Sequence, residues 1–169
     1  MKRVLVVEDE YGAAEVLKLL LEIEGYQVDL AYNGEDALRQ IERGRPDLII
    51  TDFMMPSMTG LELCAAVRNR ADLVDVPIVL VSAVDEASVR QHGGDFDAFL
   101  QKPFRAPDLL ALAARLLAEG RAQRPAPEGR TDAADAAPQR VAGRDAGSDQ
   151  ADDERSGPRA LFPKVDPQP

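Results

Sequence analysis

The chain has 169 residues, enough for one domain of ordinary size, and its 20 Lys and Arg against 30 Asp and Glu give a formal net charge of −10. Such a surface repels phosphate backbones and anionic lipid headgroups, so we expect no direct binding to DNA or to a membrane. Only four apolar residues follow Met1-Lys2-Arg3 before the first acidic residue, and no apolar run approaches the ~20 residues that span a bilayer, so we expect a cytoplasmic protein.

Short β-branched runs alternate with amphipathic segments over the first 120 residues. This alternation is typical of a parallel sheet whose strands are joined by crossover helices. The expected strands cover residues 3–7, 27–31, 48–51, 78–81 and 98–101. The expected helices cover residues 13–21, 35–42, 61–70, 86–91 and 109–117.

The first and last of these helices each carry one apolar stripe at i, i+3, i+4, i+7 and i+8. The first stripe is Ala13, Val16, Leu17, Leu20 and Leu21, and the last is Leu109, Leu112, Ala113, Leu116 and Leu117. The only cysteine, Cys64, lies at helical spacing with Leu61 and Val67, so we expect a small buried side chain. One cysteine also excludes an intramolecular disulfide and a cysteine metal cluster.

The composition changes sharply at Gly120. Residues 121–169 contain seven Pro and ten Ala but only four large apolar residues, Val141, Leu161, Phe162 and Val165. Such a segment buries too little surface to offset an ordering entropy of about 1–2 kcal/mol per residue. We therefore expect one folded domain over residues 1–120 and a disordered tail rich in Ala, Pro, Asp and Arg over residues 121–169.

Polar side chains follow four of the expected strands directly. Glu8 and Asp9 follow the first strand, Asp52 the third, Ser82 the fourth and Lys102 the fifth. Because ligands bind outside the carboxyl ends of the strands in open parallel sheets, these side chains are expected to face one crevice.

Carboxylates crowded together raise one another's pKa unless a cation lies between them. Mg²⁺ suits this set because it takes oxygen ligands, commonly one or two carboxylates together with phosphate oxygens and water. A carboxylate beside a metal, a lysine and a hydroxyl is a plausible nucleophile toward a phosphoryl group, since phosphoryl transfer needs positioning and charge neutralisation. Asp52 is the candidate nucleophile.

Four blocks of the sequence resemble the receiver domain of two-component response regulators over about residues 1–120. The blocks are Val-Val-Glu-Asp-Glu, Leu-Ile-Ile-Thr-Asp-Phe-Met-Met-Pro, Ile-Val-Leu-Val-Ser-Ala and Phe-Leu-Gln-Lys-Pro-Phe, in that order. The resemblance implies a flavodoxin-like α/β fold, in which a five-stranded parallel sheet of order 2-1-3-4-5 is flanked by five helices.

The resemblance also implies a role for each metal-site residue. Asp52 is the expected phosphoacceptor and a metal ligand, Asp9 a direct Mg²⁺ ligand, and Glu8 a ligand through water. The backbone carbonyl of Met54 is expected to complete the protein ligands. Glu8 stands where the family often has Asp, which a water-mediated ligand tolerates.

Three further roles follow from the same resemblance. Ser82 is expected to donate its hydroxyl to a phosphoryl oxygen, and Lys102 to pair with the phosphoryl charge before a Pro103 whose peptide bond is commonly cis in the family. Phe99 is the expected aromatic switch residue, together with Ser82. The segment between Ser82 and Lys102 is about two residues shorter than is usual, which predicts a short fourth helix.

The implied activity is that of a signalling protein, not an enzyme, although it takes part in its own Mg²⁺-dependent phosphorylation and dephosphorylation. The expected phosphodonor is a sensor histidine kinase or a histidine phosphotransfer protein. The expected output is phosphorylation-dependent binding to another protein, or relay of the phosphoryl group.

Two alternatives remain open. An enzyme on a similar sheet is disfavoured because no glycine-rich phosphate loop occurs and Met54 stands where an aspartyl-phosphate phosphatase has its second Asp. A receiver-like interaction module that is never phosphorylated is disfavoured by the presence of Asp52, Ser82 and Lys102. A phosphodonor assay decides between such a module and a phosphorylated receiver.

Overall fold

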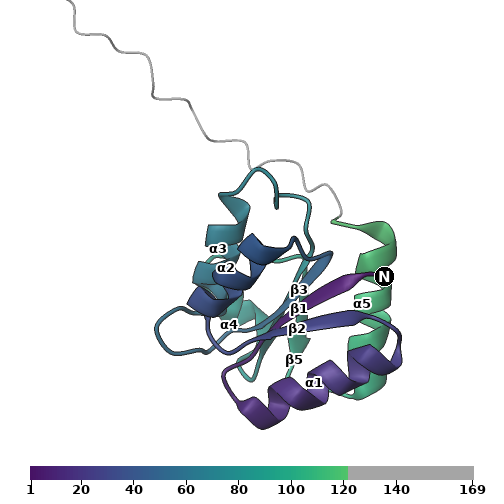
Figure 1. The fold of residues 1–169 in the computed structure, drawn as a ribbon. Coiled ribbons are helices and arrows are strands. Elements are labelled where there is room, and N and C mark those ends of the chain that lie inside the picture. The colour runs from purple at the N-terminus through teal and green to yellow at the C-terminus, as the bar shows by residue number, and fades with distance from the viewer. Residues whose placement is uncertain (122–169) are drawn as a thin grey trace, which may run out of the picture. The chain divides into compact units, whose positions relative to one another are not determined.

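The computed structural model describes residues 1–121, so that apart from Arg121 the predicted tail lies outside the described residues. Five parallel strands and five helices alternate along this part of the chain (Figure 1). The strands are β1 (Arg3–Val7), β2 (Gln27–Ala31), β3 (Leu48–Asp52), β4 (Ile78–Ser82) and β5 (Ala98–Gln101). The helices are α1 (Tyr11–Ile23), α2 (Gly34–Arg43), α3 (Gly60–Arg68), α4 (Glu86–Gln91) and α5 (Ala106–Glu119).

The sheet has the order β2-β1-β3-β4-β5, which confirms the predicted fold class. β1 pairs in parallel with β2 on one side and with β3 on the other, so Val7 lies beside both Ala31 and Thr51. β3 and β4 are buried along their whole length because helices cover both faces of the sheet. Both strands run one residue further than predicted, which makes Asp52 and Ser82 the last residues of their strands.

Two apolar clusters lie on opposite faces of the sheet. Successive side chains of a strand alternate between faces, so Val4 and Val6 join one cluster while Leu5 and Val7 join the other. α1 and α5 cover the first face, and α2, α3 and α4 cover the second (Figure 1). Each fully buried Leu or Val stabilises this arrangement by roughly 1.5–3 kcal/mol relative to an exposed one.

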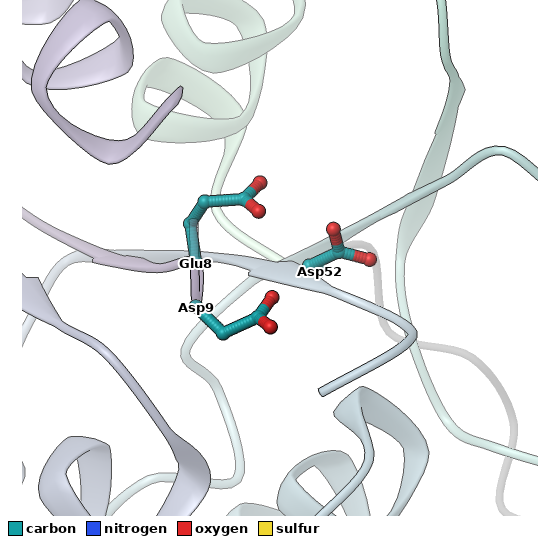
Figure 2. Close-up of side chains that lie close together, drawn as sticks. All are labelled: Glu8, Asp9 and Asp52. Carbon is teal, nitrogen blue, oxygen red and sulfur yellow. The ribbon is translucent and has the colours of Figure 1, made fainter. Parts of the chain in front are cut away.

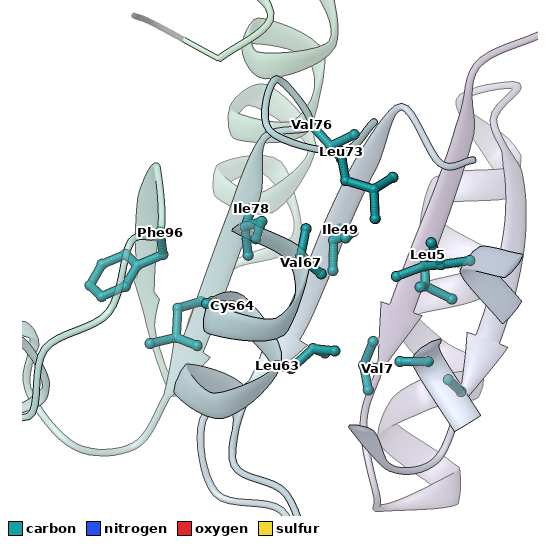
Figure 3. Packing of buried hydrophobic residues seen from close by; sticks show 14 of the residues in the cluster. Leu5, Val7, Ile49, Leu63, Cys64, Val67, Leu73, Val76, Ile78 and Phe96 are labelled. Atoms are coloured by element: carbon teal, nitrogen blue, oxygen red, sulfur yellow. The ribbon is translucent and has the colours of Figure 1, made fainter. Parts of the chain in front are cut away.

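α3 packs over the two central strands. Figure 3 shows Leu63, Cys64 and Val67 of α3 facing Ile49 and Ile78. Cys64 has no exposed surface, which confirms the prediction that it is a small core residue. α4 has only six residues, as the short segment between Ser82 and Lys102 predicts.

The predicted apolar stripe of α1 is partly wrong. The structure buries Ala14, Leu17 and Leu21, whereas Val16 is 58% exposed. Those three side chains form the side of α1 that faces the sheet, so Val16 points away from the core. In α5 the predicted stripe holds, because Leu109, Ala113 and Leu116 are buried while Leu112 and Leu117 pack at the edge of the cluster.

Candidate phosphoacceptor and metal site

Three carboxylates meet at the carboxyl ends of β1 and β3. Glu8 and Asp9 follow β1 directly, and Asp52 ends β3 on the neighbouring strand. One carboxylate oxygen of each lies within 4.8 Å of the others. Figure 2 shows the three carboxylates of Glu8, Asp9 and Asp52 gathered beside the ends of β1 and β3. The structure therefore brings together the acidic residues that the sequence predicts.

Lys102 lies among these carboxylates. Its Nζ donates to Glu8 Oε2 at 2.8 Å and to Asp52 Oδ2 at 2.5 Å. The second oxygen of Asp52, Oδ1, accepts from the backbone N–H of Met54 at 3.0 Å, which fixes the plane of the carboxylate. Lys102 is held here because its own backbone N–H donates to the Ser82 carbonyl at 2.7 Å. The Lys102–Pro103 peptide bond is cis, as the resemblance implies.

The ionisation of Glu8 and Lys102 reflects a shortage of positive charge. Burial raises the pKa of the Glu8 carboxyl above its ordinary value, the charge of Asp52 adds to the rise, and the hydrogen bond from Lys102 opposes it. Burial acts to lower the pKa of Lys102, but hydrogen bonds to Asp52 and Glu8 outweigh it and the pKa is raised. One ammonium thus faces three carboxylates, a donor set that fits a hard divalent cation.

Ser82 and Phe99 lie on one face of neighbouring strands. In the β4–β5 register Phe99 is beside Leu80 and Gln101 is beside Ser82, so the side chains of Ser82 and Phe99 point to the same side of the sheet. Ser82 is fully buried and its Oγ accepts from the backbone N–H of Val84 at 2.9 Å. Phe99 is half-buried against the apolar cluster that contains Phe96, with ring centroids 6.2 Å apart.

The β3–α3 loop holds two further features. Met55 is buried and Met54 is 63% exposed, so neighbouring methionines serve the core and the surface separately. A Cβ on Gly60 would collide with the Asp52 carbonyl oxygen and lie 2.8 Å from Leu80 Cδ1, so only glycine lets α3 begin this close to the site. The Gly60 signal in the sequence marked a helix start but did not reveal this close approach.

Sequence reasoning missed an aromatic pair beside the carboxylates. Tyr11, the first residue of α1, stacks on Tyr32, which follows β2, with ring centroids 5.7 Å apart and an interplanar angle of 22°. The pair joins residues that are distant in the sequence, so only the parallel pairing of β1 and β2 could have suggested it. Both residues lie beyond the carboxyl ends of their strands, where Glu8 and Asp9 also lie.

Comparison with known proteins agrees with this geometry. A family model described as the response regulator receiver domain matches residues 4–114. The chain belongs to this family. Receiver domains are signalling domains that accept a phosphoryl group on an aspartate and interact with histidine kinases or phosphotransfer proteins.

Curated relatives and solved structures support the same assignment. The response regulator MprA of Mycobacterium ulcerans (strain Agy99) is 42% identical over 117 residues, which cover 68% of this chain and 50% of that protein. MprA of Mycobacterium leprae (strain TN) is 41% identical over the same coverage. The chain thus spans about half the length of the curated relatives it matches.

Among solved structures, the signal receiver domain of a histidine kinase from Syntrophus aciditrophicus has a TM-score of 0.67 and 36% identity, covering 70% of this chain and 92% of that one. The response regulator TrrA from Thermotoga maritima, solved in complex with Mg²⁺ and BeF, has a TM-score of 0.61 and 36% identity, covering 69% and 99%. A receiver domain of a sensor histidine kinase from Pseudomonas aeruginosa PAO1, with a magnesium ion in its active-site cleft, has a TM-score of 0.64 and 27% identity, covering 69% and 98%.

Within residues 1–121, every helix is too short or too polar to cross a membrane.

Proposed function

We propose that Asp52 accepts a phosphoryl group from the phosphohistidine of a sensor kinase or a phosphotransfer protein, in a reaction assisted by Mg²⁺. The observation that carries this proposal is the position of Asp52, a residue that is 8% exposed at the end of β3. Its carboxylate lies 2.5 Å from Lys102 Nζ and within 4.8 Å of carboxylate oxygens of Glu8 and Asp9. The chain then signals by binding another protein in its phosphorylated form or by passing the phosphoryl group on.

The residues of the site fit a magnesium ion. Asp9 and Asp52 would bind it directly, Glu8 through water, and the Met54 carbonyl would add a neutral oxygen ligand. When bound, the ion neutralises charge on the phosphoryl oxygens. The solved receiver structures with magnesium support this assignment by similarity.

The transfer step requires little covalent chemistry from the protein. One Asp52 oxygen forms a bond to phosphorus while the bond from phosphorus to the donor imidazole nitrogen breaks, and the imidazole leaves with the electron pair and gains a proton. The N–H of Met54 orients the Asp52 carboxylate, and Lys102 already lies close enough to pair with a phosphoryl oxygen. These groups act by positioning and by electrostatic stabilisation.

Phosphorylation changes the packing of Ser82 and Phe99, and this change transmits the signal. A phosphoryl group brings charge near −2 and strong acceptor oxygens, which favour donation from the Ser82 hydroxyl. When Ser82 moves toward the phosphoryl group, Phe99 gains space on the same face of the sheet. The surface formed by α4, β5 and α5 then presents a different shape to its partner.

The net charge of −10 favours a protein partner over a nucleic-acid or membrane surface. Dephosphorylation uses the same groups: a water oxygen bonds to phosphorus while the bond from phosphorus to the Asp52 oxygen breaks, which releases inorganic phosphate and restores the carboxylate. The chain thus takes part in its own turnover without being an enzyme toward a second substrate.

Intact-mass measurement after incubation with acetyl phosphate and MgCl₂ tests the acceptor assignment. We expect the full chain to gain the mass of one phosphoryl group, and Asp52→Asn and a chelator-treated sample to gain none. A matched exposed carboxylate variant, Glu35→Gln, should be modified as the wild type is. If Asp52→Asn is phosphorylated as readily as the wild type, the assignment is wrong, and if neither reacts with acetyl phosphate or with a phosphohistidine donor, the unphosphorylated interaction module is the better account.

A further inference from the structure

The turn between β2 and α2 touches both loops that carry the candidate metal ligands, although it supplies no ligand itself. Its first contact is the stack of Tyr32 on Tyr11. Tyr11 is two residues beyond Asp9, so the stack lies at the exit of the β1–α1 loop. The residue before the turn, Ala31, accepts a hydrogen bond through its carbonyl from the Glu8 backbone N–H at 3.1 Å.

The β1–α1 loop depends on this contact because α1 begins without a side-chain cap. Glu10 is the N-cap residue and makes no capping hydrogen bond through its side chain within the described part of the chain. α2, by contrast, is capped by Asn33, whose Oδ1 accepts from the Asp36 N–H at 2.8 Å. The turn is therefore anchored to its own helix and can hold the uncapped start of α1 in place.

The second contact of the turn reaches the β3–α3 loop. A Cβ on Gly34 would lie 2.6 Å from Met58 Cγ, so Met58 packs directly on the start of α2. Met58 follows Ser57, which has a φ of 69°, a conformation that is uncommon for residues other than glycine and is held here by its surroundings. This loop begins with Asp52 and Met54, the candidate ligands from β3.

We propose that residues 32–34 form a brace that positions the β1–α1 and β3–α3 loops and thereby sets the affinity of the site for Mg²⁺, with Tyr32 and its stack on Tyr11 as the main positioning contact. This inference rests on the proposed function, because it concerns the same carboxylates. Tyr32 is a positioning residue in this proposal and acts through its stack on Tyr11, in the loop that follows Asp9. Tyr11 is 67% exposed and Tyr32 is 37% exposed, and neither residue belongs to the two apolar clusters, so removal of the rings leaves the core intact.

The test is a MgCl₂ titration of the full chain followed by amide NMR shifts or by calorimetry. A stacked aromatic pair contributes enough beyond its buried area to change an equilibrium by about two- to tenfold, so Tyr32→Ala should weaken Mg²⁺ binding by about that factor. Tyr32→Phe keeps the ring and should bind as the wild type does. Ile23→Ala truncates an exposed apolar side chain at the far end of α1 and should also leave the affinity unchanged.

A double-mutant cycle separates the stack from independent effects of each ring. If the stack carries the effect, Tyr11→Ala combined with Tyr32→Ala should lose no more affinity than either single variant. Urea midpoints of all variants should stay close to that of the wild type, because removal of the rings leaves the core intact. A change in stability alone would not alter the Mg²⁺ dissociation constant of the folded protein.

The possible failures are distinguishable. Equal Mg²⁺ affinity of Tyr32→Ala and the wild type, or losses that add fully in the double variant, would overturn the brace and leave the proposed function standing. A wild-type chain that binds no Mg²⁺ would overturn the metal site and the brace with it.

Discussion

An arginine at the end of α3 is expected to contribute more to stability than any exposed ion pair of the domain. The side chain of Arg68 is 8% exposed and lies at the amino ends of β4 and β5. Its Nη2 donates to Asp97 Oδ2 at 2.7 Å, its Nη1 to the Val76 carbonyl at 2.8 Å and its Nε to the Asp95 carbonyl at 3.1 Å. We therefore consider Arg68→Met, which keeps the apolar stem and removes the guanidinium.

The cost follows from what each partner loses. A hydrogen bond to a charged group is worth about 1.5–3 kcal/mol, and removing one member of a buried ion pair costs about 3–5 kcal/mol. Asp97 keeps the Arg121 Nε at 2.8 Å and the Ile78 N–H at 2.8 Å, which places the loss at the lower end. We expect Arg68→Met to lower the free energy of unfolding by about 3 kcal/mol.

Urea denaturation followed by far-UV circular dichroism measures this loss as a shift in midpoint of more than about 1 M. The matched control is Arg45→Met, which removes an exposed pair with Asp75 and should cost less than about 1 kcal/mol. Mg²⁺ binding by folded Arg68→Met should be unchanged, because Arg68 and its partners lie at the amino ends of the strands, whereas Asp52 lies at the carboxyl end of β3. A loss of less than about 1 kcal/mol for Arg68→Met would refute the reasoning.

Three further expectations concern the core, the tail and the switch. Burial raises the pKa of Cys64 to about 12, so at neutral pH a thiol reagent should label the native chain only as fast as the chain opens. The same reagent should label the chain fully in urea. Rapid labelling of the native chain would contradict the packing of α3. Truncation after Arg121 keeps the ion pairs of Arg121 with Asp95 and Asp97, and the composition of the removed segment predicts a melting temperature within a few degrees of that of the full chain, which calorimetry would check; a larger loss would show that the segment stabilises the domain. With Mg²⁺ and beryllofluoride, amide NMR shifts should extend into residues 86–117 in the wild type and less far in Ser82→Ala; shifts confined to the acceptor pocket in the wild type would favour a simple phosphoryl relay.

The sheet was predictable because its three inner strands, β1, β3 and β4, are buried on both faces. Residues 48–51 and 78–81 form β-branched or apolar runs in the sequence, and the burial of every residue in β3 and β4 explains that signal. α1 was placed correctly but its buried face was not. Five apolar residues share a broad side of the helix, and only the position of the sheet decides that Ala14 is buried and Val16 is exposed.

In the candidate site, the residues at the strand ends were predictable but the contacts between loops were not. Parallel strands end at one edge of the sheet, so the positions of Glu8, Asp52 and Lys102 along the chain were enough to bring them together. Contacts between loops were not predictable, because they depend on the exact path of each turn. The stack of Tyr11 on Tyr32 and the pairing of Arg68 with Asp97 join residues with no shared local pattern.

The central claim is that residue 52 becomes an acyl phosphate, and borohydride trapping tests it most directly. The full chain is phosphorylated in the presence of Mg²⁺, reduced with borohydride, digested and sequenced by tandem mass spectrometry. Reduction of an aspartyl phosphate converts the residue to homoserine, so we predict homoserine at position 52 in the phosphorylated sample and unchanged Asp52 in a sample without phosphodonor. Homoserine at another aspartate, with Asp52 unchanged after phosphorylation, would contradict the account.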